Sequence, residues 1–136
     1  MNNLISVVVT CYNHEKYIEQ CLRSVFNQTY TNIELIVLDD GSTDSSTQII
    51  QEVLKDSPFE TRFETHENLG VVKNRNLGLE LIRGDYLLFV DSDNYLDADY
   101  VEQLYSKLTE TNADIAYCDL LIQKKKSSTL KAVNLT

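Results

Sequence analysis

Hydrophobic residues in this chain occur in short continuous runs that alternate with longer periodic stretches. The runs at 4–9, 33–38 and 86–90 are dominated by aliphatic residues, which is typical of strands buried on both faces of a sheet. Between the first two runs, apolar residues recur with the spacing of one helical face, at Ile18, Cys21, Leu22 and Val25. The pattern therefore predicts a strand, a helix and a second strand, with Asn13 as the N-cap of the helix.

The same order of elements recurs after the second run. A second helix is predicted around residues 49–54, with Ser45 or Thr43 as its N-cap, and Pro58 stops it. Residues 59–65 alternate apolar and polar side chains, which is typical of a half-buried or edge strand.

A third helix precedes the apolar run at 86–90. Its inward face is predicted to consist of Val72, Leu77 and Leu81, and it ends near Gly84. The remaining predicted elements are a helix over residues 97–109 and a strand that opens at residues 115–118.

Alternating strands and helices of these lengths predict an α/β fold. A mostly parallel sheet would lie between two layers of helices, as a three-layer α/β/α sandwich joined by right-handed crossovers. Ligands of such sheets bind beyond the carboxyl ends of the strands. The loops after the three apolar runs, at residues 10–13, 39–42 and 91–93, carry polar, acidic and aromatic side chains. We therefore expect these loops to form one site at one rim of the sheet.

Size and charge narrow the function classes. A length of 136 residues fits one compact domain over residues 1–136. The 12 basic residues are outnumbered by 21 acidic ones, and the net charge of −9 argues against binding to nucleic acid or adhesion to anionic membranes. The basic run at residues 124–126 is more simply a solvated end of the chain. No apolar run approaches the ~20 residues of a membrane-spanning helix, and no signal peptide is visible.

The cysteines indicate a reducing compartment. Cys11, Cys21 and Cys118 show no metal-type spacing and cannot all pair within one chain. Cys21 falls on an apolar helical face and Cys118 in a predicted strand, so burial is the simpler interpretation of both thiols. We expect a cytoplasmic protein, with a peripheral position at the inner face of the membrane as the alternative.

The loop after the third run contains Asp91-Ser92-Asp93. Side chains two apart on an extended backbone project to the same side, so Asp91 and Asp93 can meet one ligand while Ser92 faces away. Mg²⁺ and Mn²⁺ prefer such hard oxygen ligands, and Mg²⁺ is usually held by one or two carboxylates together with the phosphates of a substrate.

The spacing alone leaves a structural turn and a metal site open. Eleven Asp residues in the chain predict about one Asp-x-Asp by chance. A second one, Asp97-Ala98-Asp99, lies where a helix is predicted to begin, and acids are favourable there without any metal. The position of Asp91 and Asp93 at the same rim as two other polar loops favours the metal site for this pair.

A series of motifs in this chain resembles the family-2 glycosyltransferases and covers nearly its whole length. The motifs are Ser6-Val7-Val8-Val9-Thr10-Cys11-Tyr12-Asn13, Gln28-Thr29-Tyr30, Glu34-Leu35-Ile36-Val37-Leu38-Asp39-Asp40-Gly41-Ser42-Thr43-Asp44, Asn68-Leu69-Gly70 with Asn74-Arg75-Asn76-Leu77-Gly78, and Gly84-Asp85-Tyr86 leading to Asp91-Ser92-Asp93. The resemblance implies the nucleotide-sugar-binding half of a GT-A fold, a UDP-type donor, and Mn²⁺ or Mg²⁺ as cofactor.

The resemblance also implies roles for residues that bind the base. Thr10 and Tyr12 would line the base pocket, with the ring of Tyr12 against the base, although Tyr12 could instead pack on the next helix. Asp40 would accept a hydrogen bond from a uracil-type N–H, and a buried acceptor of this kind discriminates strongly between bases. Asp39 would have a supporting structural role within the nucleotide-sugar-binding set.

A second group of residues would bind the sugar and the diphosphate. Asp91 would lie near the ribose or the donor sugar, and Asp93 would hold the metal, which stabilises charge on the leaving nucleoside diphosphate. Arg75 would bind phosphate oxygens bidentately, whereas Lys73 is better explained as a solvent-exposed helix residue. The candidate nucleotide-sugar-binding set is completed by Asn13, Asn68, Gly70 and Ser92.

Two departures from the family pattern bear on these expectations. Asn74 stands where the family usually has a small residue, often Ala, which puts the local helix packing in doubt. Inverting members use a carboxylate base in an acceptor-binding half downstream, so we expect the general base beyond Thr136 and identify no catalytic residue in this chain. The acceptor half is expected to be absent, and the chain alone to transfer little or no sugar.

Two functional interpretations remain. The favoured one is the donor domain of a glycosyltransferase that transfers sugar with inversion to an unknown acceptor, in polysaccharide biosynthesis by analogy. The alternative is a non-catalytic nucleotide-binding or interaction module on the same fold. Apolar surface left by a truncated sheet edge could also drive formation of a homodimer.

Overall fold

The computed structural model describes residues 3–116, 120–123 and 130–133. The chain divides into two compact units, Met1–Asp99 and Tyr100–Thr136. The single domain expected over residues 1–136 stays a prediction.

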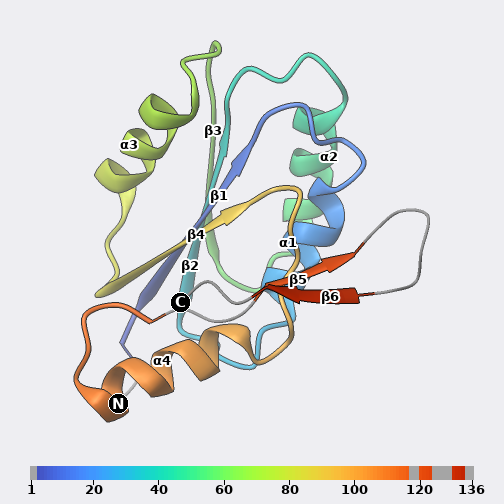
Figure 1. Cartoon of the computed structure of the whole chain (residues 1–136). Helices are drawn as coiled ribbons and strands as arrows, with labels where there is room; N and C mark the ends of the chain where they lie inside the picture. The colour runs from blue at the N-terminus through green and yellow to red at the C-terminus, as the bar shows by residue number, and fades with distance from the viewer. Residues whose placement is uncertain (1–2, 117–119, 124–129, 134–136) are drawn as a thin grey trace. The chain divides into compact units, whose positions relative to one another are not determined.

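The first unit is built on a four-stranded parallel sheet with the strand order β3-β2-β1-β4 (Figure 1). The strands are β1 (Ile5–Cys11), β2 (Ile33–Asp39), β3 (Glu60–Thr65) and β4 (Tyr86–Asp91). The helices that connect them are α1 (Ile18–Phe26), α2 (Ser46–Val53) followed by the short 3-10 helix η1 (Leu54–Asp56), and α3 (Val71–Leu81). Helices α1 and α2 lie together on one face of the sheet and α3 lies on the other (Figure 1). The predicted three-layer α/β/α arrangement is confirmed.

Burial follows the position of each strand in the sheet. The central strands β1 and β2 are buried along nearly their whole length, because helices cover both faces. The predicted edge strand is confirmed as β3, which pairs with β2 alone and leaves its side chains exposed or half-buried. The predicted apolar face of α1 is also confirmed, since all four of its members are buried: Ile18, Cys21, Leu22 and Val25.

The inward face of α3 differs from the prediction at Val72, whose side chain is 72% exposed. Asn74 and Gly78 are the buried residues of the helix, and Leu77 and Leu81 pack against the core as predicted. The sequence pattern missed this face because neither Asn nor Gly counts as apolar.

Gly78 explains how closely α3 approaches the sheet. A Cβ atom at this position would lie 2.9 Å from Val8 Cγ1 and 3.2 Å from Leu38 Cδ1, which is too close for an ordinary carbon contact. The absence of a side chain therefore lets the backbone of α3 pack directly on β1 and β2.

The predicted N-cap of the first helix is wrong. Helix α1 begins at Ile18 after Tyr17, and Asn13 lies in a loop with a φ of 52°. Asn13 Oδ1 instead accepts hydrogen bonds from the backbone N–H groups of Thr43 and Asp44, at 2.8 and 3.3 Å. An Asn side chain satisfies loop amides as readily as helical ones, and here the neighbouring loop is within reach.

The N-terminus of α2 has its cap position at Ser45, one of the two predicted residues. The Ser45 side chain makes no capping hydrogen bond. Asp44 Oδ1 accepts from Ser46 N at 2.9 Å, so the carboxylate one residue earlier satisfies the helix terminus.

The second unit contains α4 (Tyr100–Thr111) and an antiparallel pair formed by β5 (Leu120–Gln123) and β6 (Leu130–Val133). Helix α4 begins three residues later than predicted, so Asp97 precedes the helix. Ile115 and Ala116 are not in a strand, which corrects the start of the last predicted strand, and its next residues, Tyr117 and Cys118, lie outside the described residues. The basic run at 124–126 lies outside them as well.

None of the helices in the described part of the chain has the length and apolar character that a membrane crossing requires.

Candidate functional site

Three loops meet at the carboxyl ends of the parallel strands, as the sequence predicts. The backbone N–H of Asp40, after β2, donates to Cys11 O of β1 at 2.9 Å. On the other side of β1, the N–H of Ser92 donates to Thr10 O at 3.0 Å. The sheet therefore brings the candidate residues after β1, β2 and β4 to one rim.

The Asp-Ser-Asp segment is a turn, which corrects the extended backbone assumed from the sequence: β4 ends at Asp91, and Asn94 N donates to Asp91 O at 3.0 Å. Asp91 and Asp93 are exposed, with 49% of the Asp91 side chain accessible, while Ser92 is fully buried. Ser92 Oγ lies 2.5 Å from His14 Nδ1. The Ser92 hydroxyl is therefore engaged within the chain, and a contact of Ser92 with a ligand stays a prediction.

Asp91 is held by two of the other candidate residues. Its Oδ1 accepts from Thr10 Oγ1 at 3.2 Å and from Arg75 Nη2 at 3.1 Å. The Arg75 guanidinium also lies over the ring of Phe89, 5.6 Å from its centroid. Arg75 Nε is buried and has no hydrogen-bond partner among the described residues. A guanidinium has five N–H donors and the Arg75 side chain is 43% exposed, so donors other than the buried Nε remain for an anion beside Asp91.

The donor set for a metal consists of Asp91 and Asp93. No group of three or more His, Cys, Asp or Glu side chains suited to a metal occurs within the described residues. Two carboxylates fit Mg²⁺ or Mn²⁺ nonetheless, because Mg²⁺ is commonly bound through one or two carboxylates, with water and substrate phosphates as its other ligands. Asp91 and Asp93 could therefore hold such a metal together with the phosphates of a bound ligand.

Asp39 is fully buried and occupied by contacts within the chain. Its carboxylate accepts hydrogen bonds from Ser42 N and Ser42 Oγ, and from the hydroxyls of Thr47 and Thr65 at 3.1 Å each. These contacts join the loop after β2 to α2 and to the end of β3. They fit the supporting structural role expected for Asp39.

Asp40 is only 4% exposed and connects the loop after β2 to the loop before α3. Its two carboxylate oxygens accept from Leu69 N at 2.8 Å and from Gly70 N at 3.1 Å, while Asn68 Nδ2 donates to its backbone carbonyl at 3.1 Å. A carboxylate has about four lone-pair sites, so each oxygen can accept one further hydrogen bond. The structure thus brings together three candidate residues: Asp40, Asn68 and Gly70.

Gly41 is a residue of this site that the sequence analysis did not single out. Its φ is +76°, and a Cβ atom there would lie 2.6 Å from Asn68 N. The close approach of the two loops therefore requires glycine at this position. The Asp-Gly-Ser turn signal was visible in the sequence, but the neighbouring loop that it touches was not.

The remaining candidates differ in their accessibility. The Tyr12 side chain is 46% exposed immediately after β1, so its ring is open to a ligand at the rim. The side-chain oxygen of Asn13 accepts a hydrogen bond from the neighbouring loop, as described above. Lys73 is exposed on α3, and its interpretation as a solvent-exposed helix residue is confirmed.

His66 is a second residue that the sequence analysis missed. Its Nε2 lies 2.9 Å from Asn74 Oδ1, and its Nδ1 lies 2.7 Å from Glu67 O and 3.6 Å from Asp40 Oδ1. Asn74 is buried by this contact, so the unusual Asn of α3 packs with a polar partner. The sequence around His66 contains no hydrophobic pattern or motif that would have indicated its role.

The surroundings of His66 alter its acidity. Burial by itself lowers the pKa of the imidazole, but the hydrogen bonds to Glu67 O and Asn74 Oδ1 and the charges of Asp40 and Asp39 outweigh burial and raise the pKa above 6.5.

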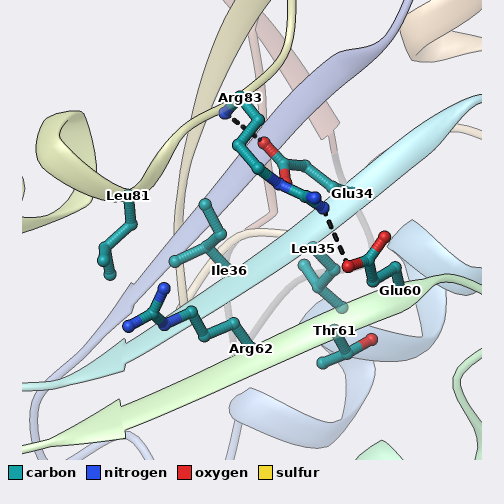
Figure 2. Close-up of a pocket in the computed structure, with 8 residues that line it drawn as sticks. All are labelled: Glu34, Leu35, Ile36, Glu60, Thr61, Arg62, Leu81 and Arg83. Atoms are coloured by element: carbon teal, nitrogen blue, oxygen red, sulfur yellow. Dashed lines mark hydrogen bonds and ion pairs between the residues drawn. The ribbon is translucent and has the colours of Figure 1, made fainter.

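A hollow on the α3 face of the sheet lies at the opposite, amino-terminal ends of β2 and β3 (Figure 2). Its volume of about 230 Å³ is below the range typical of ligand pockets. Arg83 crosses it and pairs with Glu34 at 3.0 Å and Glu60 at 2.9 Å. The fourth charged residue of its lining, Arg62, pairs with Glu64 at 3.0 Å. All of its charged groups therefore have partners, and we assign the hollow no ligand.

Known proteins that are similar to this chain are glycosyltransferases. The family model described as "Glycosyl transferase family 2" matches residues 6–133. The chain is 44% identical over 116 residues to "Glycosyltransferase GlyA" of Streptococcus pneumoniae, covering 85% of this chain and 16% of that protein. It is 42% identical over 122 residues to an "Uncharacterized glycosyltransferase" of Haemophilus influenzae, covering 86% and 49%. The chain thus spans at most about half the length of these curated relatives.

Solved structures with a similar fold include S. aureus TarS 1-349. Its complex with UDP and its complex with UDP-GlcNAc each have a TM-score of 0.72 and 33% identity to this chain. The match covers 80% of this chain and about a third of TarS 1-349. The α/β fold described above is therefore that of GT-A glycosyltransferases.

Proposed function

This chain belongs to glycosyl transferase family 2, and we propose that it binds the nucleotide-sugar donor of a glycosyltransferase, together with a divalent metal. The observation that carries the proposal is the arrangement at one sheet rim of an open aromatic ring, a buried acceptor and two exposed carboxylates, one of which is paired with an Arg. The relevant residues are Tyr12, Asp40, Arg75, Asp91 and Asp93.

The base would bind between the loops after β1 and β2. The exposed ring of Tyr12 offers a stacking surface, and Asp40 offers an acceptor already fixed by Leu69 N and Gly70 N. Because the Asp40 carboxylate is fixed before the ligand arrives, a base N–H meets an acceptor that needs no further ordering. Asn68 lies beside it and can add a side-chain contact to the base edge.

We favour a uracil nucleotide for this pocket. A carboxylate acceptor matches the N–H of uracil, and a base without that donor would leave Asp40 desolvated and unpaired. The TarS structures were determined with UDP and UDP-GlcNAc, which supports the same donor class at 33% identity.

The diphosphate would bind next to Arg75 and Asp93. Arg75 has further N–H donors besides the one that binds Asp91, and a guanidinium can donate to two phosphate oxygens at once. Mg²⁺ or Mn²⁺ bound by Asp93 and Asp91 would supply Lewis-acid stabilisation of the charge on the leaving nucleoside diphosphate. Asp91, fixed by Thr10 and Arg75, would orient the ribose or the sugar.

The proposal concerns donor binding, because the chain spans at most about half the length of the curated relatives described above. Transfer with inversion to an acceptor, and a general base outside the described residues, remain part of the same proposal for the whole protein. We also propose a cytoplasmic location, where the free thiols of Cys11 and Cys21 would stay reduced.

Calorimetric titration with UDP, in the presence and absence of Mn²⁺, tests the proposal. We expect binding that Mn²⁺ strengthens, and the same titration with GDP is expected to show weaker binding. Wild-type protein that is folded by circular dichroism and binds UDP under neither condition would overturn the proposal.

A further inference from the structure

Asp39 and Asp40 place two neighbouring carboxylates in the interior of the first unit. The groups that donate to them are neutral: hydroxyls and backbone N–H groups for Asp39, and two backbone N–H groups for Asp40. Among the described residues neither carboxylate forms an ion pair with Lys or Arg. Buried carboxylates without a cation are costly, so a nearby positive charge is strongly favoured.

His66 is the basic side chain in position to supply that charge. Its Nδ1 lies 3.6 Å from Asp40 Oδ1, and its side chain is only 18% exposed. Both of its ring nitrogens face acceptors, Glu67 O at 2.7 Å and Asn74 Oδ1 at 2.9 Å. An imidazolium donates from both nitrogens and satisfies both acceptors, whereas a neutral imidazole has only one N–H.

The groups around His66 come from three elements. The end of β2 and the residue after it contribute the charges of Asp39 and Asp40, α3 contributes the uncharged amide of Asn74, and the loop before α3 contributes the carbonyl of Glu67. The field at the imidazole is therefore negative.

We propose that protonated His66 is a positioning residue of the base pocket, and that binding of the nucleotide at Asp40 is coupled to uptake of a proton by His66. This inference rests on the proposed function, since it concerns the same pocket. His66 acts through two contacts: it balances the charge of Asp40, and with Asn74 it fixes the loop that carries Asn68, Leu69 and Gly70 to the first turns of α3.

The direction of the coupling follows from burial. A bound base covers Asp40 and removes its remaining water, so the attraction between the carboxylate and an imidazolium becomes stronger. Ligand binding therefore favours protonated His66, and by linkage protonation of His66 favours binding. Affinity should be highest below the pKa of His66 and fall as the pH rises through it.

The test uses UDP-GlcNAc with constant Mg²⁺, because both phosphates of this probe are esterified and stay ionised across the range measured. Titration between about pH 6 and pH 8.5, where a histidine loses its charge, should show affinity falling about five- to tenfold, the lower end of coupling between two sites. Calorimetry near the midpoint, in two buffers of different ionisation enthalpy, should show net proton uptake on binding.

Two variants assign the effect to His66. His66→Gln keeps a hydrogen-bonding side chain without a charge, and should bind with pH-independent affinity and no proton uptake. Asn74→Ala removes the acceptor of Nε2, and should move the midpoint of the pH profile to lower pH.

The outcomes separate this inference from the proposed function. If the wild type binds no UDP-GlcNAc at any pH, the proposed function fails. If it binds without proton uptake, or if His66→Gln retains the pH profile of the wild type, the proposed function stands and the role of His66 is refuted. Should His66→Gln fail to fold, an unshifted profile of Asn74→Ala refutes it equally.

Discussion

Arg75 and Asp91 form an ion pair, with Nη2 of the guanidinium 3.1 Å from Oδ1 of the carboxylate. The two side chains come from different elements, α3 and the end of β4, and both are expected to contact the donor. Roughly half of each side chain is exposed, so the pair itself adds little stability. Its consequence is positional: Arg75 and Asp91 hold each other in place at the rim before a ligand arrives.

Replacing Arg75 should therefore weaken binding of UDP. Hydrogen bonds to charged groups contribute about 1.5 to 3 kcal/mol, so Arg75→Ala should lose about 10- to 100-fold in affinity. Arg75→Lys should recover part of this loss, because an ammonium keeps the charge without the bidentate geometry. Lys73→Ala, an exposed cation on the same helix, is the matched control and should bind normally. Equal losses in Arg75→Ala and Lys73→Ala would indicate a general charge effect.

Asp93 should carry the dependence on metal. Asp93→Ala should bind UDP with the same affinity with and without Mn²⁺, because the variant keeps only one of the two carboxylates proposed to hold the metal. Asp97→Ala, in the second Asp-x-Asp, controls for the loss of one acidic charge and should respond to Mn²⁺ like the wild type. Calorimetry measures both variants. A Mn²⁺ response that survives in Asp93→Ala would assign the metal to other residues.

The sequence predicted the sheet and its rim because the relevant patterns are local. Aliphatic runs identify buried strands, and parallel order then brings their carboxyl ends together, so Thr10, Asp40 and Asp91 could be grouped without coordinates. What the sequence could not show is which groups satisfy one another across loops. The pairing of His66 with Asn74 joins residues eight apart in a geometry that no periodicity encodes.

Errors in the prediction also share a cause. Asn13 and Val72 were assigned from the average preferences of Asn and Val, and tertiary contacts decided both positions. The side chain of Asn13 accepts from backbone N–H groups of the neighbouring loop. Val72 lies on the side of α3 opposite the face formed by Asn74, Leu77, Gly78 and Leu81, and is therefore exposed.

Gly78→Ala should destabilise the fold. The added Cβ would lie 2.9 Å from Val8 Cγ1, in a region where β1 and β2 are fully packed, so α3 or the sheet must shift. Overpacking of this kind costs about 1 to 3 kcal/mol, which exceeds the gain in helix propensity from Gly to Ala. Glu80→Ala, at an exposed position of the same helix, is the control and should change the free energy of unfolding little. Urea denaturation measures both; unchanged stability of Gly78→Ala would contradict the packing described here.

Glu34, at the amino-terminal end of β2, should make the free energy of unfolding depend on pH. Burial alone would raise the pKa of Glu34, but hydrogen bonds from Ser6 Oγ, Arg83 N and Arg83 Nε, together with the guanidinium charge, lower it below 4.5. A carboxyl whose pKa is lower in the folded state contributes stability above its unfolded pKa, and that contribution is lost as the pH falls through the folded pKa.

Glu34→Gln should therefore cost stability at neutral pH and much less in acid. At about pH 7 the loss should be about 1 to 2 kcal/mol, because the donors that face the carboxylate keep only a neutral acceptor. As the pH falls through the folded pKa of Glu34, the wild-type carboxyl itself takes up a proton, so the difference between the two proteins should shrink. Glu60→Gln provides the control, since Glu60 binds the same Arg83 from an exposed position. A difference in the free energy of unfolding that is constant across this pH range would show that Glu34 acts through its shape and not through its charge.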